Sequence, residues 1–164
     1  MHKSELRQQL RAQRQAMTSA DVAQKSALIT AGVQTILDKL TYKSLHCYEP
    51  IASLKEVDVS MLEAEATYTT RNFEGQWQVV SFKTGAVVAH PQIDVIIVPM
   101  LGFDDKLHRI GYGGGYYDRL MAAHPQALRI GVCFEAGHID RIPVEGHDMA
   151  VNIVVTEERV VISV

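Results

Sequence analysis

Asp94-Val95-Ile96-Ile97-Val98 is the stretch that decides the fold, because its four β-branched apolar residues show no alternation with polar ones. Such a run is typical of a central strand covered on both faces of a sheet. Leu128–Phe134 and Ile153–Val155 are predicted to be further buried strands, and Tyr116–Ala123 is predicted to be a helix. Strands that alternate with helices predict an α/β fold: a three-layer α/β/α domain, Rossmann-like, with a mostly parallel central sheet. Ligands of such sheets gather beyond the carboxyl ends of the strands, here the loops after Val98 and Phe134.

Two helices are predicted to open the chain. The first covers Lys3–Met17, and the second follows the N-cap hydroxyls of Thr18 and Ser19, with Asp21 in its first turn. Apolar residues with a period of about 3.6 residues continue the second helix to Leu40. Shorter elements are predicted after it: strands at Leu45–Tyr48, Thr67–Arg71 and Trp77–Phe82, and a helix at Val57–Ala66.

The composition is that of an ordinary globular protein. The chain has 164 residues, 47% of them apolar and 21% charged, with a net charge of −3, and we expect one domain over residues 1–164. This charge gives no general attraction for nucleic acid. No apolar run approaches the roughly 20 residues that span a membrane, and the polar N-terminus lacks an apolar signal segment. Cys47 and Cys133 indicate buried free thiols in a reducing compartment. We therefore expect a cytoplasmic protein, either a monomer or a weak homo-oligomer.

The segment Arg109-Ile-Gly-Tyr-Gly-Gly-Gly-Tyr-Tyr-Asp-Arg119 has four glycines in five positions. Without Cβ atoms, its backbone can bring several N–H groups to one anion, and the helix that follows adds the positive end of its dipole. The segment is neither a Walker A loop, which needs Lys-Ser/Thr after the last glycine, nor a dinucleotide fingerprint. Composition alone leaves two interpretations open, a phosphate-binding loop and a flexible glycine-rich turn.

A family resemblance favours the first interpretation. Pro99-Met-Leu-Gly-Phe-Asp104, followed by Arg109–Arg119, closely resembles the signature of the 5-formyltetrahydrofolate cyclo-ligases, also called methenyltetrahydrofolate synthetases. Three weaker motifs match in order: the basic helix from Lys3 to Arg7, Glu56-Val-Asp58, and Pro143-Val-Glu-Gly-His-Asp148 followed by Val155-Thr-Glu157.

The resemblance implies an ATP- and Mg²⁺-dependent ligase that converts 5-formyltetrahydrofolate into 5,10-methenyltetrahydrofolate and releases ADP and phosphate. It implies that Arg109 and Tyr116 are catalytic and that Asp118 and Asp148 hold Mg²⁺. The residues that it assigns to ATP are Lys3, Ser4, Glu5, Leu6, Arg7, Arg109, Ile110, Gly111, Tyr112, Gly113, Gly114, Gly115, Tyr116 and Tyr117. Those that it assigns to the folate are Ile51, Glu56, Tyr112, Gly113, Gly114, Gly115 and Tyr116.

The general structural preferences of these residue types also allow simpler roles for several of them. Asp118 and Glu56 could each be an acidic residue in the first turn of a helix, and Asp148 could be a turn residue after Gly146. Arg11 and Arg14 continue the basic stripe of the first helix, and we expect them to be surface or helix-packing residues.

The middle of the chain departs from the family pattern. Residues 59–92 are fewer than typical relatives carry there, and Phe73, Trp77, Phe82 or Met100 would have to supply the apolar folate contacts. This departure motivates an alternative hypothesis, a non-catalytic nucleotide- or folate-binding module on the same fold. A third hypothesis is a different α/β enzyme that acts on a sugar phosphate or an acyl group.

Overall fold

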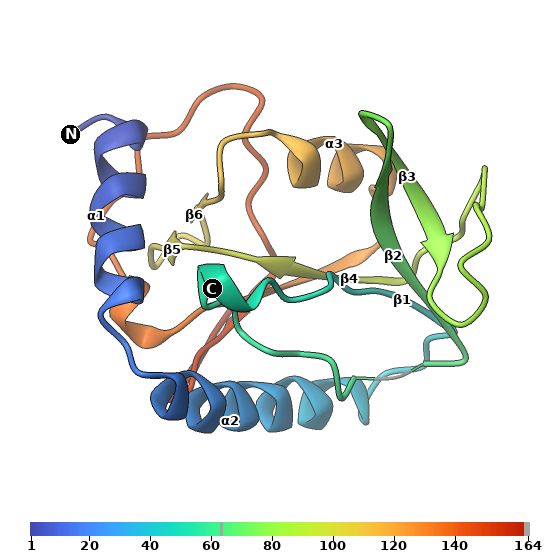
Figure 1. The fold of residues 1–164 in the computed structure, drawn as a ribbon, viewed down its shortest axis with the longest axis horizontal. Coiled ribbons are helices and arrows are strands. Elements are labelled where there is room, and N and C mark those ends of the chain that lie inside the picture. The colour runs from blue at the N-terminus through green and yellow to red at the C-terminus, as the bar shows by residue number, and fades with distance from the viewer. Residues whose placement is uncertain (63, 163–164) are drawn as a thin grey trace.

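The computed structural model describes residues 1–62 and 64–162. In this part of the chain, seven strands form one sheet in the order β3-β2-β1-β4-β7-β8-β9 (Figure 1). Their bounds are β1 Ser44–His46, β2 Ala66–Phe73, β3 Gln76–Ser81, β4 Val95–Pro99, β7 Leu128–Val132, β8 Ile153–Val155 and β9 Val160–Ile162. The five strands from β2 to β8 are mutually parallel, and only the edge strands β3 and β9 pair antiparallel. The prediction of a mostly parallel sheet is confirmed.

The predicted central strand occupies the middle of the sheet. All five residues of β4 are buried, and it pairs with β1 on one side and with β7 on the other. Its β-branched side chains therefore pack against both covering layers, as the lack of alternation predicted.

Helices cover both faces of the sheet, so the three-layer prediction is also confirmed (Figure 1). α2 (Ser19–Leu37) packs Ile29, Val33 and Leu37 against one face. α3 (Tyr116–Ala123) packs Leu120 and Met121 against the other. Thr18 caps α2 as expected, because its hydroxyl accepts a hydrogen bond from the Asp21 N–H at 3.1 Å. Among the described residues, no helix is both long enough and apolar enough to cross a membrane.

α1 (Lys3–Gln15) lies at one end of the sheet and does not cover a face (Figure 1). Its Leu6 and Leu10 pack with Leu101 and Ile110, which lie just before and within a small ribbon beyond the end of β4. The ribbon is formed by the strands β5 (Gly102–Phe103) and β6 (Arg109–Ile110). Neither strand was predicted, because two residues are too few to show a period.

The predicted helix at Val57–Ala66 is wrong, apart from residue 63, which lies outside the described residues. A single 3₁₀ turn, η1 (Ala52–Leu54), precedes this segment, and β2 begins at Ala66. Val57 and Val59 are both buried in the core beneath α2, which requires extended chain rather than a helix. Side chains of the neighbouring elements hold that chain in place: the Tyr48 hydroxyl donates to the Val57 carbonyl at 2.6 Å, and the Ser26 hydroxyl accepts from the Asp58 N–H at 2.9 Å.

The two cysteines are free and buried, as predicted. Burial raises the pKa of both thiols, Cys47 and Cys133, to about 12. Both side chains therefore behave as small apolar groups of the core and not as nucleophiles.

Candidate active site

Two adjoining cavities lie beyond the carboxyl ends of the parallel strands. The first has a volume of about 650 Å³ and the second about 790 Å³. Pro99, at the end of β4, lines both cavities, and so do Tyr112, Tyr116 and Tyr117. Tyr112 lies in the loop before α3, and Tyr116 and Tyr117 are the first residues of α3. The three tyrosines form the boundary between the two spaces.

The glycine segment forms one wall of the first cavity. Gly113 has a φ of 100° and Gly115 has a φ of 69°, conformations that other residues rarely adopt. Gly115 is also the N-cap of α3. A side chain at Gly114 would meet no atom within 4 Å, so the loop is not packed against the sheet. Backbone N–H groups and a helix N-terminus therefore face an open space, the arrangement expected for an anion site.

Cationic side chains surround this loop, and two of them pair with aspartates. Arg109 Nη2 lies 3.1 Å from Asp118 Oδ1, and the Lys3 ammonium contacts Asp148 Oδ2. Arg7 does not pair with an acid there: its Nε donates to the Gly111 carbonyl at 3.1 Å. Each predicted metal carboxylate is thus held by a predicted nucleotide-binding cation.

Backbone N–H groups fix the same two carboxylates. Asp118 Oδ1 accepts from the Met149 N–H at 3.0 Å, and Asp148 Oδ2 accepts from the Glu145 N–H at 2.8 Å. Burial raises the pKa of Asp148, but its bonds to Lys3 and the Glu145 N–H lower it more, so the net pKa lies below the ordinary value. Asp148 is therefore a carboxylate at neutral pH.

The pair of aspartates fits a magnesium ion that shares its ligands with phosphate. Mg²⁺ usually takes one or two carboxylates and completes its octahedron with water and phosphate oxygens. Asp118 and Asp148 both line the first cavity, and their side chains are 18% and 20% exposed. No group of three or more His, Cys, Asp and Glu in residues 1–62 and 64–162 could hold a metal by itself. A metal in this cavity would therefore depend on ligand oxygens.

The second cavity is more apolar and contains a buried carboxylate. Glu56 is only 7% exposed, and its Oε1 accepts from the Ile51 N–H at 2.9 Å. Burial raises the pKa of Glu56, while the Ile51 N–H, Arg14 and Tyr112 oppose that rise. Trp77 of β3 lines the same cavity, with its ring 6.1 Å from that of Tyr116. The cavity therefore combines aromatic faces with one acceptor of hydrogen bonds.

Comparison with known protein families gives a direct match. The model of the 5-formyltetrahydrofolate cyclo-ligase family matches residues 30–157. This chain belongs to that family. The match covers most of the chain, including residues 59–92 and all of the glycine segment.

Known cyclo-ligases align with this chain over different lengths. The 5-formyltetrahydrofolate cyclo-ligase of Escherichia coli K12 is 34% identical over 71 residues, 42% of this chain and 39% of the relative. The Mycolicibacterium smegmatis cyclo-ligase is 40% identical over 73 residues, 44% of this chain and 38% of the relative. The chain thus spans about two fifths of those two relatives. The Mycoplasma pneumoniae cyclo-ligase is 25% identical over 166 residues, 96% of this chain and 100% of the relative.

Two solved structures have the same fold as this family member. A 5,10-methenyltetrahydrofolate synthetase from Mycoplasma pneumoniae superposes with a TM-score of 0.80 at 22% identity, covering 96% of this chain and 99% of the other. The 5,10-methenyltetrahydrofolate synthetase of Aquifex aeolicus gives a TM-score of 0.80 at 23% identity, with coverages of 99% and 93%. At these identities the likeness concerns the fold alone.

The structure of this cyclo-ligase family member brings most of the predicted site residues to the two cavities. The predicted residues that line the first cavity are Lys3, Ser4, Arg7, Arg109, Gly111, Tyr112, Gly113, Gly114, Gly115, Tyr116, Tyr117, Asp118 and Asp148. Those that line the second are Ile51, Glu56, Tyr112, Tyr116 and Tyr117. The glycines predicted to touch the folate therefore face the first cavity. The binding roles of all these residues remain predictions.

Three of the predicted ATP-binding residues lie elsewhere. Leu6 and Ile110 are buried together in the apolar contact between α1 and the β5–β6 ribbon. The Glu5 carboxylate accepts from the His2 N–H at 3.3 Å, and this bond caps the start of α1. The residues expected to supply apolar folate contacts also separate: Trp77 lines the second cavity, whereas Met100 is buried in the core. Phe73 and Phe82 are 43% and 51% exposed.

Arg14 was expected to be a surface or helix-packing residue, and the structure adds a contact with the candidate site that sequence reasoning missed. Arg14 is only 6% exposed, and Nη1 donates to the Tyr112 hydroxyl at 3.0 Å. Nη2 donates to the Met100 carbonyl at 2.7 Å, and the guanidinium lies 5.2 Å from the Phe134 ring centre. Arg14 therefore fixes a tyrosine that lines both cavities. Its place on the basic stripe of α1 could have indicated an inward role.

Proposed function

We propose that this chain converts 5-formyltetrahydrofolate into 5,10-methenyltetrahydrofolate in an ATP- and Mg²⁺-dependent reaction that releases ADP and phosphate. One observation carries the proposal: the tyrosines of the glycine segment line both cavities, so ligands of the two cavities would meet across a single loop. A phosphate-binding loop beside an aromatic cavity is what a phosphoryl transfer to a folate requires. The names of the related cyclo-ligases support the same reaction.

In this proposal, the first cavity holds the triphosphate. The bare backbone N–H groups of Gly113 and Gly115 face its oxygens, and Arg109 and Lys3 supply the positive charge. Both cations are already positioned by aspartates. Phosphoryl transfer depends mainly on positioning and charge neutralisation, so the fixed cations account for most of what this cavity contributes.

Asp118 and Asp148 are the residues that would hold Mg²⁺. When bound, the metal would neutralise phosphate charge beside the loop. Asp148 and Asp118 now pair with Lys3 and Arg109, and a metal held by the two carboxylates would leave both cations available to phosphate oxygens. The proposed site therefore favours the metal and the nucleotide together over either alone, because each one compensates the charge that the other leaves unpaired.

The second cavity takes the folate in this proposal. Glu56 accepts hydrogen bonds from the N–H groups of the pterin ring, and Trp77 offers an aromatic face to it. Tyr116, at the boundary, lies where the formyl oxygen of the folate would meet the γ-phosphate. That oxygen attacks the γ-phosphorus and displaces ADP. N10 then attacks the formyl carbon and gives up its proton, and the carbon–oxygen bond breaks so that phosphate leaves, taking that proton, as the new ring closes.

The direct test is to mix the protein with 5-formyltetrahydrofolate and Mg-ATP and to follow the absorbance of the methenyl product. We expect product to form only when ATP, the metal and the folate are all present. An Arg109→Ala variant serves as the matched negative control. Absence of product at high protein concentration would contradict the proposal. Tight binding of ATP or folate without turnover would instead favour the non-catalytic binding module.

A further inference from the structure

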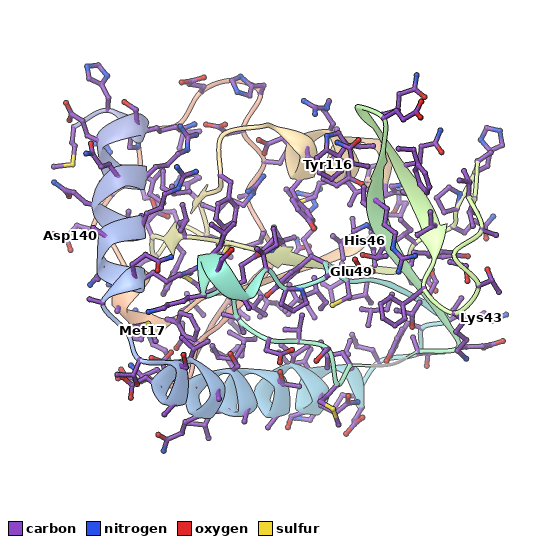
Figure 2. The ribbon with its side chains drawn as sticks, in the orientation of Figure 1. Met17, Lys43, His46, Glu49, Tyr116 and Asp140 are labelled. Atoms are coloured by element: carbon purple, nitrogen blue, oxygen red, sulfur yellow. The ribbon has the colours of Figure 1, made fainter. Side chains whose placement is uncertain are left out.

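The Tyr116 hydroxyl contacts one side chain outside the glycine segment, and that side chain contacts a second one. The Thr70 hydroxyl, on β2, contacts the Tyr116 hydroxyl, and Thr70 Oγ1 lies 2.8 Å from His46 Nε2 on β1. Figure 2 labels Tyr116 at α3 and His46 below it, both beside β2 and on the same side of the sheet. Three polar side chains, His46, Thr70 and Tyr116, therefore form a row of contacts from the core of the sheet to the boundary between the two cavities.

His46 is buried and uncharged. It is 0% exposed, and the Tyr117 ring packs edge-on against it with ring centres 6.2 Å apart. Burial, with a smaller contribution from His124, lowers the pKa of His46 to about 3, although its own backbone carbonyl opposes the change. The imidazole is therefore neutral at physiological pH and carries one ring proton, on either Nε2 or Nδ1.

The surroundings of the two ring nitrogens decide where that proton lies. Nδ1 is buried, and no acceptor among the described residues, its own backbone carbonyl included, reaches it in full hydrogen-bond geometry, whereas Nε2 lies 2.8 Å from the Thr70 hydroxyl. A buried N–H without an acceptor is rarer in proteins, and more unfavourable, than a buried acceptor without a donor. The proton therefore belongs on Nε2, and His46 donates to Thr70.

The donor at His46 fixes which group donates and which accepts in both hydrogen bonds of this row. Thr70 Oγ1 accepts from His46, and its other side-chain contact in the described structure is Tyr116, so the Thr70 proton points to the Tyr116 oxygen. The Tyr116 proton is then free to point into the cavities. With the proton on Nδ1 the order would reverse: Thr70 would donate to His46, and Tyr116 would donate to Thr70 and offer only lone pairs to a ligand.

We propose that His46 and Thr70 are positioning residues that hold the Tyr116 hydroxyl as a hydrogen-bond donor toward a ligand oxygen that carries or develops negative charge. The donor direction itself rests on the contacts above. That the acceptor is an oxygen of the reacting formyl or phosphoryl group rests on the proposed function. Donors already aimed at such an oxygen stabilise a transition state more than donors that must reorient.

The first test reads the tautomer directly and needs no activity. Long-range ¹H–¹⁵N correlation spectra of the full chain distinguish the two neutral histidine tautomers, and a His46→Gln variant assigns the signal by removing it. We expect His46 to be the Nε2–H tautomer at neutral pH. An Nδ1–H tautomer, or a charged ring, would overturn the proposal.

The second test is a mutant cycle on kcat/KM. Thr70→Val and His46→Leu each remove one link, and we expect each to lower kcat/KM about tenfold, as for a lost buried hydrogen bond. Tyr116→Phe removes the donor itself and should lower it on the order of 10²-fold. In the Tyr116→Phe background, Thr70→Val should change kcat/KM less than about twofold, since the coupled group is already gone. Full additivity of the two losses would overturn the proposal.

Conservative replacement separates positioning from packing. A glutamine amide can place an N–H near the position of Nε2, so His46→Gln should recover most of the loss seen in His46→Leu. Thr41→Val, at an exposed position outside both cavities, is the matched control and should behave as wild type. Equal losses in His46→Gln and His46→Leu would point to packing alone and overturn the proposal.

Failure of this positioning proposal can be distinguished from failure of the proposed function. If the wild-type chain binds 5-formyltetrahydrofolate but forms no product, the proposed function is wrong. The same mutant cycle is then measured with the dissociation constant of 5-formyltetrahydrofolate, from calorimetry, in place of kcat/KM. The spectra decide the tautomer in either case.

Discussion

The two cavities are built in different ways. The first is lined largely by one continuous loop from His108 to Asp118, with the start of α1 and the segment before β8 completing it. The second is assembled from the loop after β1, from β2 and from Trp77 of β3, with Arg11 of α1 at its edge. Backbone groups and paired charges dominate the first cavity, whereas aromatic and aliphatic side chains dominate the second. The two are joined only by Pro99 and the tyrosines of the glycine segment.

Because of this difference, we expect the affinity for the nucleotide and the affinity for the folate to depend on different parts of the molecule. A continuous loop can be preserved while the strands beside it become shorter, because its conformation depends on its own glycines. The second cavity has no such independence, since it exists only when the strands meet in the correct register. Variants of each cavity should therefore affect one ligand, and variants of the shared boundary should affect both.

Arg109→Ala should give the largest effect and change the first cavity alone. We expect turnover to fall on the order of 10²- to 10³-fold, or about 2.7–4 kcal/mol, as for other lost charge-stabilising donors. The Arg109 side chain is only 8% exposed and pairs with Asp118, so the free energy of unfolding should also fall, by about 1–3 kcal/mol. Steady-state kinetics, calorimetry with each ligand and denaturant unfolding measure these changes.

The control for that prediction is Arg141→Ala, an exposed arginine that lines neither cavity. It should leave turnover and stability unchanged. Folate affinity that falls together with turnover in Arg109→Ala would show that the cavities are not independent.

Glu56→Gln is the corresponding change in the second cavity. The amide oxygen can still accept from the Ile51 N–H, but the charge is lost. We expect the affinity for 5-formyltetrahydrofolate to fall by about 1.5–3 kcal/mol, as for hydrogen bonds to charged groups, and the affinity for Mg-ATP to stay unchanged. Calorimetry with each ligand tests both expectations. Glu65→Gln, at an exposed position, controls for the loss of one negative charge.

Arg14→Leu should affect both cavities, because it removes the donor that fixes Tyr112. The Tyr112 hydroxyl and the Met100 carbonyl would lose their partner, so we expect the protein to lose about 1–3 kcal/mol of stability and to bind both ligands more weakly. Denaturant unfolding and calorimetry measure the two effects. Arg141 is exposed and lines neither cavity, and Arg141→Leu should change stability by no more than about 0.5 kcal/mol. Similar stability losses in the two variants would remove Arg14 from this role.

The last prediction is a pH dependence of stability that comes from His46 and changes neither cavity. Its folded pKa is about 3, below its unfolded value of 6.5, so the unfolded chain binds more protons between these values. Stability is therefore complete above pH 6.5 and falls as the pH is lowered, by about 1.4 kcal/mol per pH unit for this one group. Unfolding experiments between pH 5 and 7 should show this slope in wild type and lose it in His46→Gln. The exposed His90→Gln control should keep it.

Much of the architecture was predictable because its determinants are local. The β-branched run of β4 predicted a strand buried on both faces, and Thr18 with Asp21 predicted the start of α2. The segment after Glu56 was not predictable, because Val57 and Val59 become extended only by packing beneath α2. The edge strand β9 (Val160–Ile162) also escaped prediction, since its pairing partner β8 supplies most of the reason for it to be a strand.

The sequence by itself determined the types of element, their order, and the loop whose conformation needs glycine. These features follow from residue volume, periodicity and backbone freedom, which act over a few residues. Only the tertiary structure decided which distant side chains meet: Arg14 with Tyr112, 98 positions apart, Lys3 with Asp148, 145 apart, and Thr70 with Tyr116, 46 apart. Such contacts depend on strand order and on how each helix lies against the sheet, and no local pattern encodes that geometry.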